Sequence, residues 1–237
     1  MRTVNKLLRG SRQFLHRWWR ANRRLFCLFV FVVIPLKSSV ADWNWVPTGS
    51  MNPTIVEGDL VYVNKVAYGL RVPLTKHRLV TWGNPERGDI VVLFSPEDGT
   101  RLVKRVIGLP GDVLEMRDNV VYVGGQALEY RPLDPDLTGD LEAELRSMAR
   151  FAEEDLLGKR HAVMGLPGGA GRDFSRVRVP EGEYFVMGDS RDNSKDSRAF
   201  GFAERRSIVG RAEAVIVSFN KLDKYQPRFG RFFSGLE

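Results

Sequence analysis

Short runs of β-branched and aromatic residues, separated by glycine and proline, recur along the chain from residue 60 onwards. Such runs are typical of β-strands, because branched and aromatic side chains pack well on a pleated surface. The runs predict six strands, over residues 60–66, 89–94, 101–107, 120–123, 184–187 and 212–219. Pro110 and Gly111, after the third run, are the residues of a type II turn. We expect an all-β fold, a coiled barrel or sandwich of several short antiparallel sheets.

Residues 131–176 depart from this pattern. Within residues 140–157 apolar side chains recur at helical spacing, at Leu141, Leu145, Met148, Phe151 and Ala152. This spacing predicts a short amphipathic helix, and the glycine-rich residues 165–171 that follow predict a flexible loop. We therefore interpret residues 131–176 as a small inserted α/β subdomain.

The strand pattern and its interruption give an expected order of parts. They are a first part of the main β-domain at 42–130, the inserted subdomain at 131–176, a second part at 177–220 and a basic, aromatic tail at 221–237. The tail mixes arginine with phenylalanine, and this composition is consistent both with contact to lipid headgroups and with exposure to solvent.

An apolar run, Leu25 to Leu36, follows a basic N-terminal stretch. A transmembrane helix needs about 20 apolar residues, and this run is shorter. Lys37 can still extend it by reaching the interface, and Trp43 and Trp45 stand where an interfacial aromatic belt would lie. The prediction is one N-terminal transmembrane helix at 25–41, after a basic cytoplasmic segment at 1–24, with the remaining chain on the outer side.

A cleavable signal peptide is the alternative interpretation of this segment. Ser39, Val40 and Ala41 have the small-x-small form of a signal-peptide cleavage site. Under that alternative the mature chain begins at Asp42. Both interpretations direct the rest of the chain to the outer side of the membrane.

The distribution of charge argues against a nucleic-acid partner. Residues 1–24 carry eight basic side chains and no acidic one, while the rest of the chain has 28 basic against 29 acidic residues. The formal net charge of +7 is thus concentrated at the N-terminus, as expected for a segment that meets a membrane surface. Cys27 is the only cysteine, which excludes an intramolecular disulfide and a cysteine-based metal site.

Ser50 is a candidate nucleophile in the polar segment 47–54, where Gly49 frees the backbone and Pro53 stiffens it. A serine hydroxyl is a poor nucleophile until a base removes its proton. The chain has three histidines, of which His77 and His161 are on the outer side, so we expect another group to be the base. By itself the segment is equally described as a polar loop leaving the membrane.

Lys104 is the candidate base. Strand alternation places Lys104 on one face with Leu102 and Val106, while Arg101 and Arg105 share the opposite face. Burial among aliphatic neighbours disfavours the ammonium and lowers the pKa of a lysine, as a general base at neutral pH requires. The alternative is a lysine on an edge strand whose amine reaches water.

Residues 188–198 combine a glycine with many charged and hydroxyl side chains directly after a predicted strand. This composition predicts a tightly hydrogen-bonded loop, with a solvated turn as the alternative. The spacing of a calcium-binding EF-hand loop is absent, and Arg191, Lys195 and Arg198 would repel a cation.

Three segments in this order, 47–54, 103–112 and 188–198, together resemble the motifs of type I signal peptidases, the bacterial leader peptidases. The resemblance covers about residues 43–130 and 177–214 and leaves the insertion unmatched. It implies that Ser50 is the nucleophile that becomes acylated and that Lys104 is its general base.

The resemblance also implies roles for neighbouring residues. Ser194 would orient Lys104, and the backbone N–H of Ser50 with the hydroxyl of Thr48 would form the oxyanion hole. Asp196 and Arg198 would form a salt bridge that supports the site. Shallow pockets for small substrate side chains would be lined by Val46, Met51, Ile55, Leu102 and Val103.

The implied function is that of a membrane-bound endopeptidase that cleaves signal peptides from exported preproteins after a small-x-small motif. It would need no metal or cofactor, act as a monomer on signal peptides at a lipid surface, and lie in the bacterial cytoplasmic (inner) membrane. The single span would leave the N-terminus in the cytoplasm and the catalytic domain on the periplasmic side.

Other functions stay open. A peptidase specialised for a pilin or a conjugation component would share this chemistry, and a single-pass β-domain that only binds partners would not need Ser50 or Lys104. A penicillin-recognising enzyme is disfavoured, because Pro53 and not lysine stands three residues after Ser50.

Overall fold

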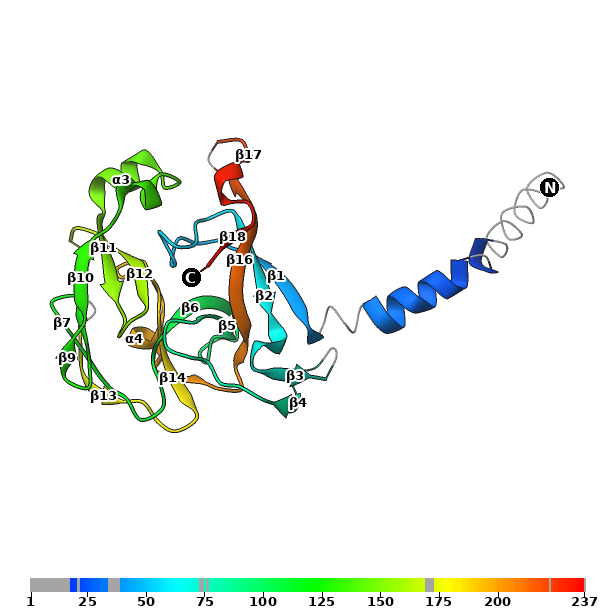
Figure 1. Ribbon diagram of the computed structural model, residues 1–237, viewed down its shortest axis with the longest axis horizontal. Helices are drawn as coiled ribbons and strands as arrows, with labels where there is room; N and C mark the ends of the chain where they lie inside the picture. The colour runs from blue at the N-terminus through cyan, green and yellow to red at the C-terminus, as the bar shows by residue number, and fades with distance from the viewer. Residues whose placement is uncertain are drawn as a thin grey trace.

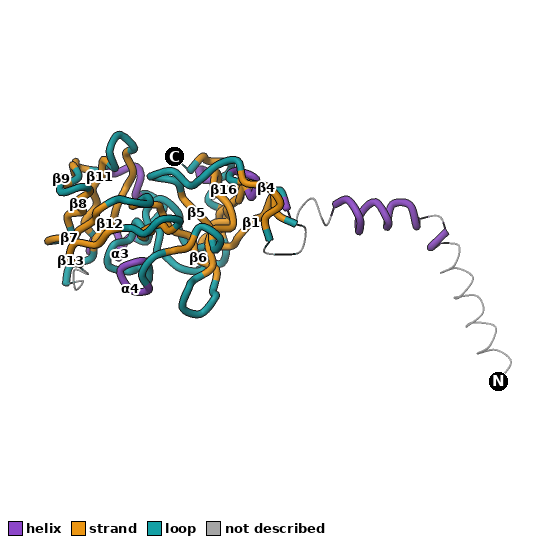
Figure 2. The backbone as a smooth tube through the Cα atoms, turned by 90° about the horizontal axis from the view of Figure 1, so that it is seen from below, coloured by secondary structure: helices purple, strands orange, loops and turns teal. Residues whose placement is uncertain are grey.

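A computed structural model describes residues 18–20, 22–33, 39–72, 75, 77–168, 173–221 and 223–236. Figures 1 and 2 show a body of β-sheets, from which the helical segment before residue 34 extends. Residues 22–28 of that segment are helical and continue into the π-helix η1 (Phe29–Val33), which has no buried residue.

The predicted membrane anchor is only partly within the described residues. Of the basic segment 1–24, residues 1–17 and 21 lie outside them, and of the predicted span 25–41, residues 34–38 do. Among the helices that are described, none combines the length and the apolar character needed to cross a bilayer.

A central antiparallel sheet forms the body of the protein. Its strands follow the order β1 (Ala41–Trp45), β2 (Asp59–Asn64), β16 (Ile208–Asn220), β5 (Ile90–Phe94), β6 (Arg101–Gly108), β14 (Glu183–Met187) and β15 (Ala203–Glu204). The long strand β16 also pairs with β17 (Gln226–Pro227) and β18 (Ser234–Gly235). Strand β16 therefore joins the N-terminal, middle and C-terminal parts of the chain.

Three smaller sheets and a few short helices complete the fold. One sheet contains β10 (Glu129–Pro132), β11 (Arg150–Asp155) and β12 (Arg160–Gly165), another β13 (Phe174–Arg178), β7 (Val113–Arg117), β8 (Val120–Val123) and β9 (Gln126–Ala127), and the third β3 (Gly69–Arg71) and β4 (Arg78–Thr81). The helices are η2 (Lys65–Ala67), η3 (Pro135–Thr138), α3 (Ala143–Met148), α4 (Ser197–Phe200) and η4 (Phe229–Arg231). In Figure 1 the sheets built from β7 to β13 lie on the left of the body and β1 to β4 on the right.

The mostly β architecture predicted from the sequence is confirmed. The six predicted strands correspond to β2, β5, β6, β8, β14 and β16. The predicted turn is also present, since the N–H of Asp112 donates to the carbonyl of Leu109 at 3.0 Å and Gly111 has a φ of 88°. These features are local, so residue type alone is sufficient to specify them.

The prediction of an amphipathic helix over residues 140–157 is wrong for the residues after Met148. Helix α3 ends at Met148, and the chain then forms β11 between β10 and β12. Leu141, Leu145 and Phe151 do pack in one apolar cluster, with Val56 and Met164. The apolar spacing thus reflects side chains buried on one side of a short helix and of the strand that follows it. Because β11 pairs with a strand on each edge, its backbone N–H and C=O groups are hydrogen-bonded.

Candidate active site

Ser50 and Lys104 lie side by side although they come from different elements. Ser50 is in the loop between β1 and β2, and Lys104 is in the first half of β6. The Nζ of Lys104 lies 2.7 Å from the Oγ of Ser50 and donates to the carbonyl of Val103 at 2.9 Å. This arrangement has the geometry of a nucleophile in contact with a base.

The environment of Lys104 favours its neutral form. The residue is only 2% exposed, and burial lowers the pKa of its amine from 10.5 to about 8. The carboxylates of Asp196 and Asp189 act in the opposite direction, and Arg198 acts in the same direction as burial. A usable fraction of this lysine is therefore uncharged near neutral pH.

The backbone of Ser50 is held by the loop that follows β14. The N–H of Ser190 donates to the carbonyl of Ser50 at 3.2 Å. Gly188 lies so close that a Cβ on it would be 2.3 Å from the Ser50 carbonyl oxygen and 2.3 Å from the Oγ of Ser194. The absence of a side chain at position 188 therefore allows the two loops to meet.

Ser194 is buried beside this contact, and its nearby hydroxyl helps to lower the pKa of the Asp196 carboxyl. Arg198 donates to the same carboxylate at 2.9 and 2.7 Å, and both members of this pair are buried. Burial alone would raise the pKa of Asp196, but the bonds from Arg198 and from the N–H of Gly188 bring it below its ordinary value. The carboxylate is thus a fixed anion that anchors the loop 188–198.

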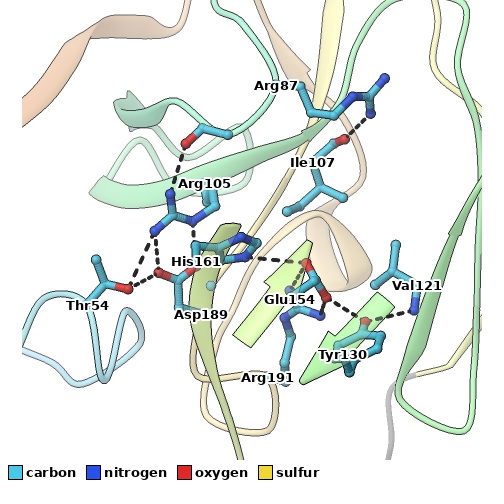
Figure 3. A network of polar contacts seen from close by, with 12 residues as sticks. Thr54, Arg87, Arg105, Ile107, Val121, Tyr130, Glu154, His161, Asp189 and Arg191 are labelled. Carbon is cyan, nitrogen blue, oxygen red and sulfur yellow. Dashed lines mark hydrogen bonds and ion pairs between the residues drawn. The ribbon is translucent and has the colours of Figure 1, made fainter. Parts of the chain in front are cut away.

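A second buried network lies behind the dyad, and sequence reasoning missed it. Arg105, next to Lys104 on β6, donates to both carboxylate oxygens of Asp189 at 2.9 and 2.8 Å, and to the carbonyl of Gly88 at 2.9 Å. The hydroxyl of Thr54 donates to Asp189 at 2.6 Å. Figure 3 shows Arg105 and Thr54 converging on this carboxylate.

The network continues into the inserted strands (Figure 3). Arg191 donates to both oxygens of Glu154 on β11 at 2.8 and 2.7 Å, and Tyr130 donates to the same carboxylate at 2.5 Å. The Nε2 of His161 on β12 is 3.3 Å from Glu154 and 3.9 Å from Asp189. These contacts tie the insertion to the loop 188–198.

The two histidines considered as rival bases lie elsewhere. His161 belongs to the network just described, and burial lowers its pKa to about 4, so its imidazole is neutral at pH 7. His77 is exposed just before β4. Within the described residues, no group of three or more His, Cys, Asp or Glu side chains could hold a metal ion.

Four of the five residues predicted to line substrate pockets gather in one apolar cluster, namely Val46, Met51, Ile55 and Val103. Leu102 instead packs with Val106 in a neighbouring cluster, as expected from strand alternation. Thr48, the predicted oxyanion donor, is exposed on the loop two residues before Ser50.

The residues that the sequence did not reveal share one property. Arg105, Asp189, Glu154, His161 and Arg191 are charged or titratable side chains that the fold buries. Two signals pointed to them, the density of charge at 188–198 and the arginine next to Lys104. Neither signal identified which partner each side chain would find.

Comparisons with known proteins all find signal peptidases. The family model described as "Signal peptidase, peptidase S26" matches residues 18–217. Signal peptidase I of Pseudomonas fluorescens is 33% identical over 217 residues, which cover 85% of this chain and 74% of that protein. Signal peptidase I of Pseudomonas aeruginosa is 34% identical over 210 residues, which cover 80% of this chain and 69% of that protein.

One solved structure is also similar in sequence. It is the crystal structure of a signal peptidase I from Enterococcus faecalis, with 31% identity over 55% of this chain and 98% of that chain. The TM-score is 0.35, so the likeness in shape carries no argument about the fold.

Proposed function

Because the chain belongs to the signal peptidase family, peptidase S26, and is thus a peptidase that removes signal peptides, we propose that Ser50 and Lys104 carry the reaction. Ser50 is the nucleophile and Lys104 is the general base. The observation that carries the proposal is the 2.7 Å contact between Ser50 Oγ and the amine of a buried lysine. A neutral amine at this distance can accept the serine proton directly.

The reaction then has two halves. As Ser50 Oγ attacks the scissile carbonyl, Lys104 takes its proton and afterwards gives a proton to the leaving amine. Water next attacks the ester on Ser50, with Lys104 again accepting a proton. The N–H of Ser50 and the hydroxyl of Thr48 stabilise the oxyanion in both halves, and Ser194 keeps Lys104 oriented. No metal or cofactor takes part in these steps.

In the described part of the chain, strands β6 and β1 each have an unpaired edge along which an extended substrate can bind. Among the described strands, residues 101–104 of β6 pair with β5 alone and β1 pairs with β2 alone. Arg101 donates to Asn44 at 2.6 Å and to Asp42 at 2.8 Å, which places the start of β6 close to β1. A peptide that adds to such an edge exposes alternate side chains to the same surface.

The proposed specificity follows from that alternation. The first and third residues before the cleaved bond face the same way, toward the pocket residues Val46, Met51, Ile55 and Val103, and the remaining predicted pocket residue, Leu102, lies on the neighbouring face of β6. Because most of these side chains are packed in the core, the surface they present is shallow and suits small side chains. The chain therefore cleaves after small-x-small sequences.

The proposed location is the bacterial cytoplasmic membrane. The basic residues 1–24 stay in the cytoplasm, residues 25–41 form a single-pass anchor, and the catalytic domain at 42–130 and 177–220 lies on the periplasmic side as a monomer. Trp43 and Trp45 on β1 are 47% and 57% exposed, which suits contact with lipid headgroups. Sequencing the N-terminus of the purified protein tests the anchor, because a mature chain beginning at Asp42 would exclude it.

Cleavage of a preprotein in detergent by wild type, Ser50→Ala and Lys104→Met tests the catalytic proposal. We expect both variants to fold and both to lose cleavage. Full activity of Lys104→Met would rule out the dyad and make His77 the next residue to examine. Ser194→Ala tests the orienting role separately, with a partial loss of activity expected.

A further inference from the structure

The C-terminal segment is packed against the loop that carries Ser50. We call residues 226–236 the C-terminal arm. It comprises β17, η4 and β18, and both of its strands pair with β16. The sequence suggested two alternatives for the tail, contact with lipid or exposure to solvent. Packing of the tail against β16 was not predicted.

Arg231 makes the main polar contacts of the arm. Its side chain is only 12% exposed. The guanidinium donates to the carboxylate of Asp59 at 3.2 and 2.7 Å and to the backbone carbonyl of Thr54 at 3.0 Å. A third nitrogen donates to Asp140, ahead of helix α3, at 3.3 Å. One arginine therefore joins the arm, the Ser50 loop and the insertion.

Asp59 is the centre of these contacts. It is completely buried and also accepts a hydrogen bond from the N–H of Val56 at 2.9 Å. Because a buried carboxylate needs a cation and donors, Arg231 is required for Asp59 to hold the end of the loop in this form.

Thr54 is held from two directions. Arg231 binds its carbonyl, while its hydroxyl donates to Asp189 at 2.6 Å, which Arg105 holds in turn. Thr54 is linked back to Ser50 by a tight turn, in which the N–H of Ile55 donates to the carbonyl of Met51 at 3.0 Å. The two arginines thus hold one short loop through different groups of Thr54, Arg231 directly at the carbonyl and Arg105 through Asp189 at the hydroxyl.

The arm also contacts the predicted substrate pocket. Leu236 packs against the apolar cluster that contains Val46, Met51 and Ile55, and its N–H donates to the carbonyl of Glu213 at 2.9 Å. The end of the arm is therefore fixed to β16 and lies against the pocket residues.

We propose that Arg231 is a positioning residue for catalysis, which keeps the loop 50–56 in the conformation that brings Ser50 Oγ to Lys104. The proposal rests on the proposed role of Ser50 as the nucleophile. The side chain of Arg231 bonds to Asp59, Thr54 and Asp140 and not to Ser50 or Lys104, so its effect is on how often Ser50 Oγ and Lys104 are in contact. A displacement of about 1 Å in a reacting group can cost about 100-fold in rate.

The experiment compares single-turnover cleavage by the full chain in detergent, with enzyme in excess over a preprotein. Under that condition a loss of folded enzyme lowers the amplitude or the apparent affinity, whereas misplacement of Ser50 lowers the saturating rate constant. The main variant is the double change Asp59→Asn with Arg231→Gln, because it removes both buried charges together. The second is Arg231→Lys, which keeps a cation for Asp59 and is the form to use if the double variant does not fold.

We expect the double variant to lose about 10-fold to 100-fold in the saturating rate constant, with half-saturation within about twofold of wild type. Arg231→Lys is expected to recover part of this loss, because lysine can pair with Asp59 but lacks the planar fork that also reaches Thr54. The control is Arg206→Ala, since Arg206 pairs with Glu204 on the surface with an 85% exposed side chain. Its rate constant should equal that of wild type.

Rate constants within twofold of wild type in both Arg231 variants would overturn the proposal. So would a change confined to amplitude or half-saturation, because that marks a loss of folded enzyme and a purely structural role. Ser50→Ala, included in the same series, separates the two hypotheses. If it cleaves, the proposed nucleophile is wrong, and if it is inactive while the Arg231 variants are fully active, only the positioning role is wrong.

Discussion

Lys104 and Arg105 are neighbours on β6 and are both 2% exposed, yet the protein surrounds them in opposite ways. The amine of Lys104 contacts a hydroxyl and a carbonyl, at Ser50 and Val103. The guanidinium of Arg105 is bound by both oxygens of one carboxylate, Asp189. Strand alternation separates the two environments, because consecutive side chains point to opposite faces.

The difference teaches how one strand serves both chemistry and support. A buried cation without a directly bonded carboxylate loses the stabilisation of its charge, so its pKa falls and it can act as a base. A buried cation with a bidentate carboxylate remains charged and fixes the groups around it. The Lys104 side is thus the proposed reactive region, and the Arg105 side is a supporting one.

The largest effect is expected from Lys104→Arg, which makes the reactive region resemble the supporting one. Arginine keeps the positive charge but does not deprotonate in proteins, so no base remains for Ser50. We expect kcat/KM for preprotein cleavage to fall by at least about 1,000-fold. Lys195→Arg is the matched control, because Lys195 pairs with Glu97 with a 54% exposed side chain. Retention of more than a tenth of wild-type activity by Lys104→Arg would contradict the assignment.

Arg105→Met breaks the supporting region instead. It leaves the carboxylate of Asp189 buried without its cation, and the loss of one member of a buried ion pair costs about 3–5 kcal/mol. Urea denaturation should show this decrease in the free energy of unfolding. Arg206→Ala, at a surface pair, should leave the unfolding curve unchanged. Equal curves for the two variants would show that the pair on β6 does not support the fold.

Gly188→Ala tests the junction between the two regions, since Gly188 precedes Asp189 and contacts Ser50. The new Cβ would lie 2.3 Å from the Ser50 carbonyl oxygen, so one of the loops must move. We expect a destabilisation of about 1–3 kcal/mol and a lower kcat, measured by urea denaturation and by cleavage assay. Gly139→Ala is the control, because the nearest atom to its Cβ would be at an ordinary 3.4 Å. Wild-type behaviour of Gly188→Ala would argue against the close packing of these loops.

The smallest effect is a graded dependence on pH. Only the neutral amine of Lys104 can accept the serine proton, and burial sets its pKa at about 8. Activity should therefore fall as the pH drops below about 8, approaching tenfold for each further pH unit. His161→Gln should leave the midpoint in place, because His161 contacts Glu154 and Asp189 rather than Ser50. A midpoint that disappears in this variant would point to histidine as the base.

Much of the central sheet could be predicted because its signals are local. Runs such as 101–107 and 120–123 contain the residues that strands favour, and the structure has strands there. The helix predicted at 140–157 was wrong after Met148, also because its signal is local. Apolar residues at helical spacing fit a short helix followed by a strand as well as they fit one longer helix. Pairing between β11 and its two neighbours decided the conformation after Met148.

The site was harder to predict than the sheet. Alternation placed Lys104 among aliphatic neighbours, but its contact with Ser50 depends on how the chain folds over 54 positions. Arg105 and Asp189 are 84 residues apart, and Arg231 and Asp59 are 172 apart. No periodic pattern marks such partners, because charged side chains are mostly exposed and nothing local shows which of them will be buried in a pair. A resemblance to a family points to the reactive groups more readily than to those that hold them.

The position of β16 has a consequence for how the protein is made. The ribosome synthesises the segments that carry Ser50 and Lys104 long before β16 and the C-terminal arm. Strand β16 nevertheless lies between β2 and β5 in the central sheet. A nascent chain therefore contains Ser50 and Lys104 before β16, the strand that joins β2 to β5. Contacts between residues so distant in sequence form slowly. The sheet that brings the proposed reactive groups together is therefore complete only after β16 has been synthesised.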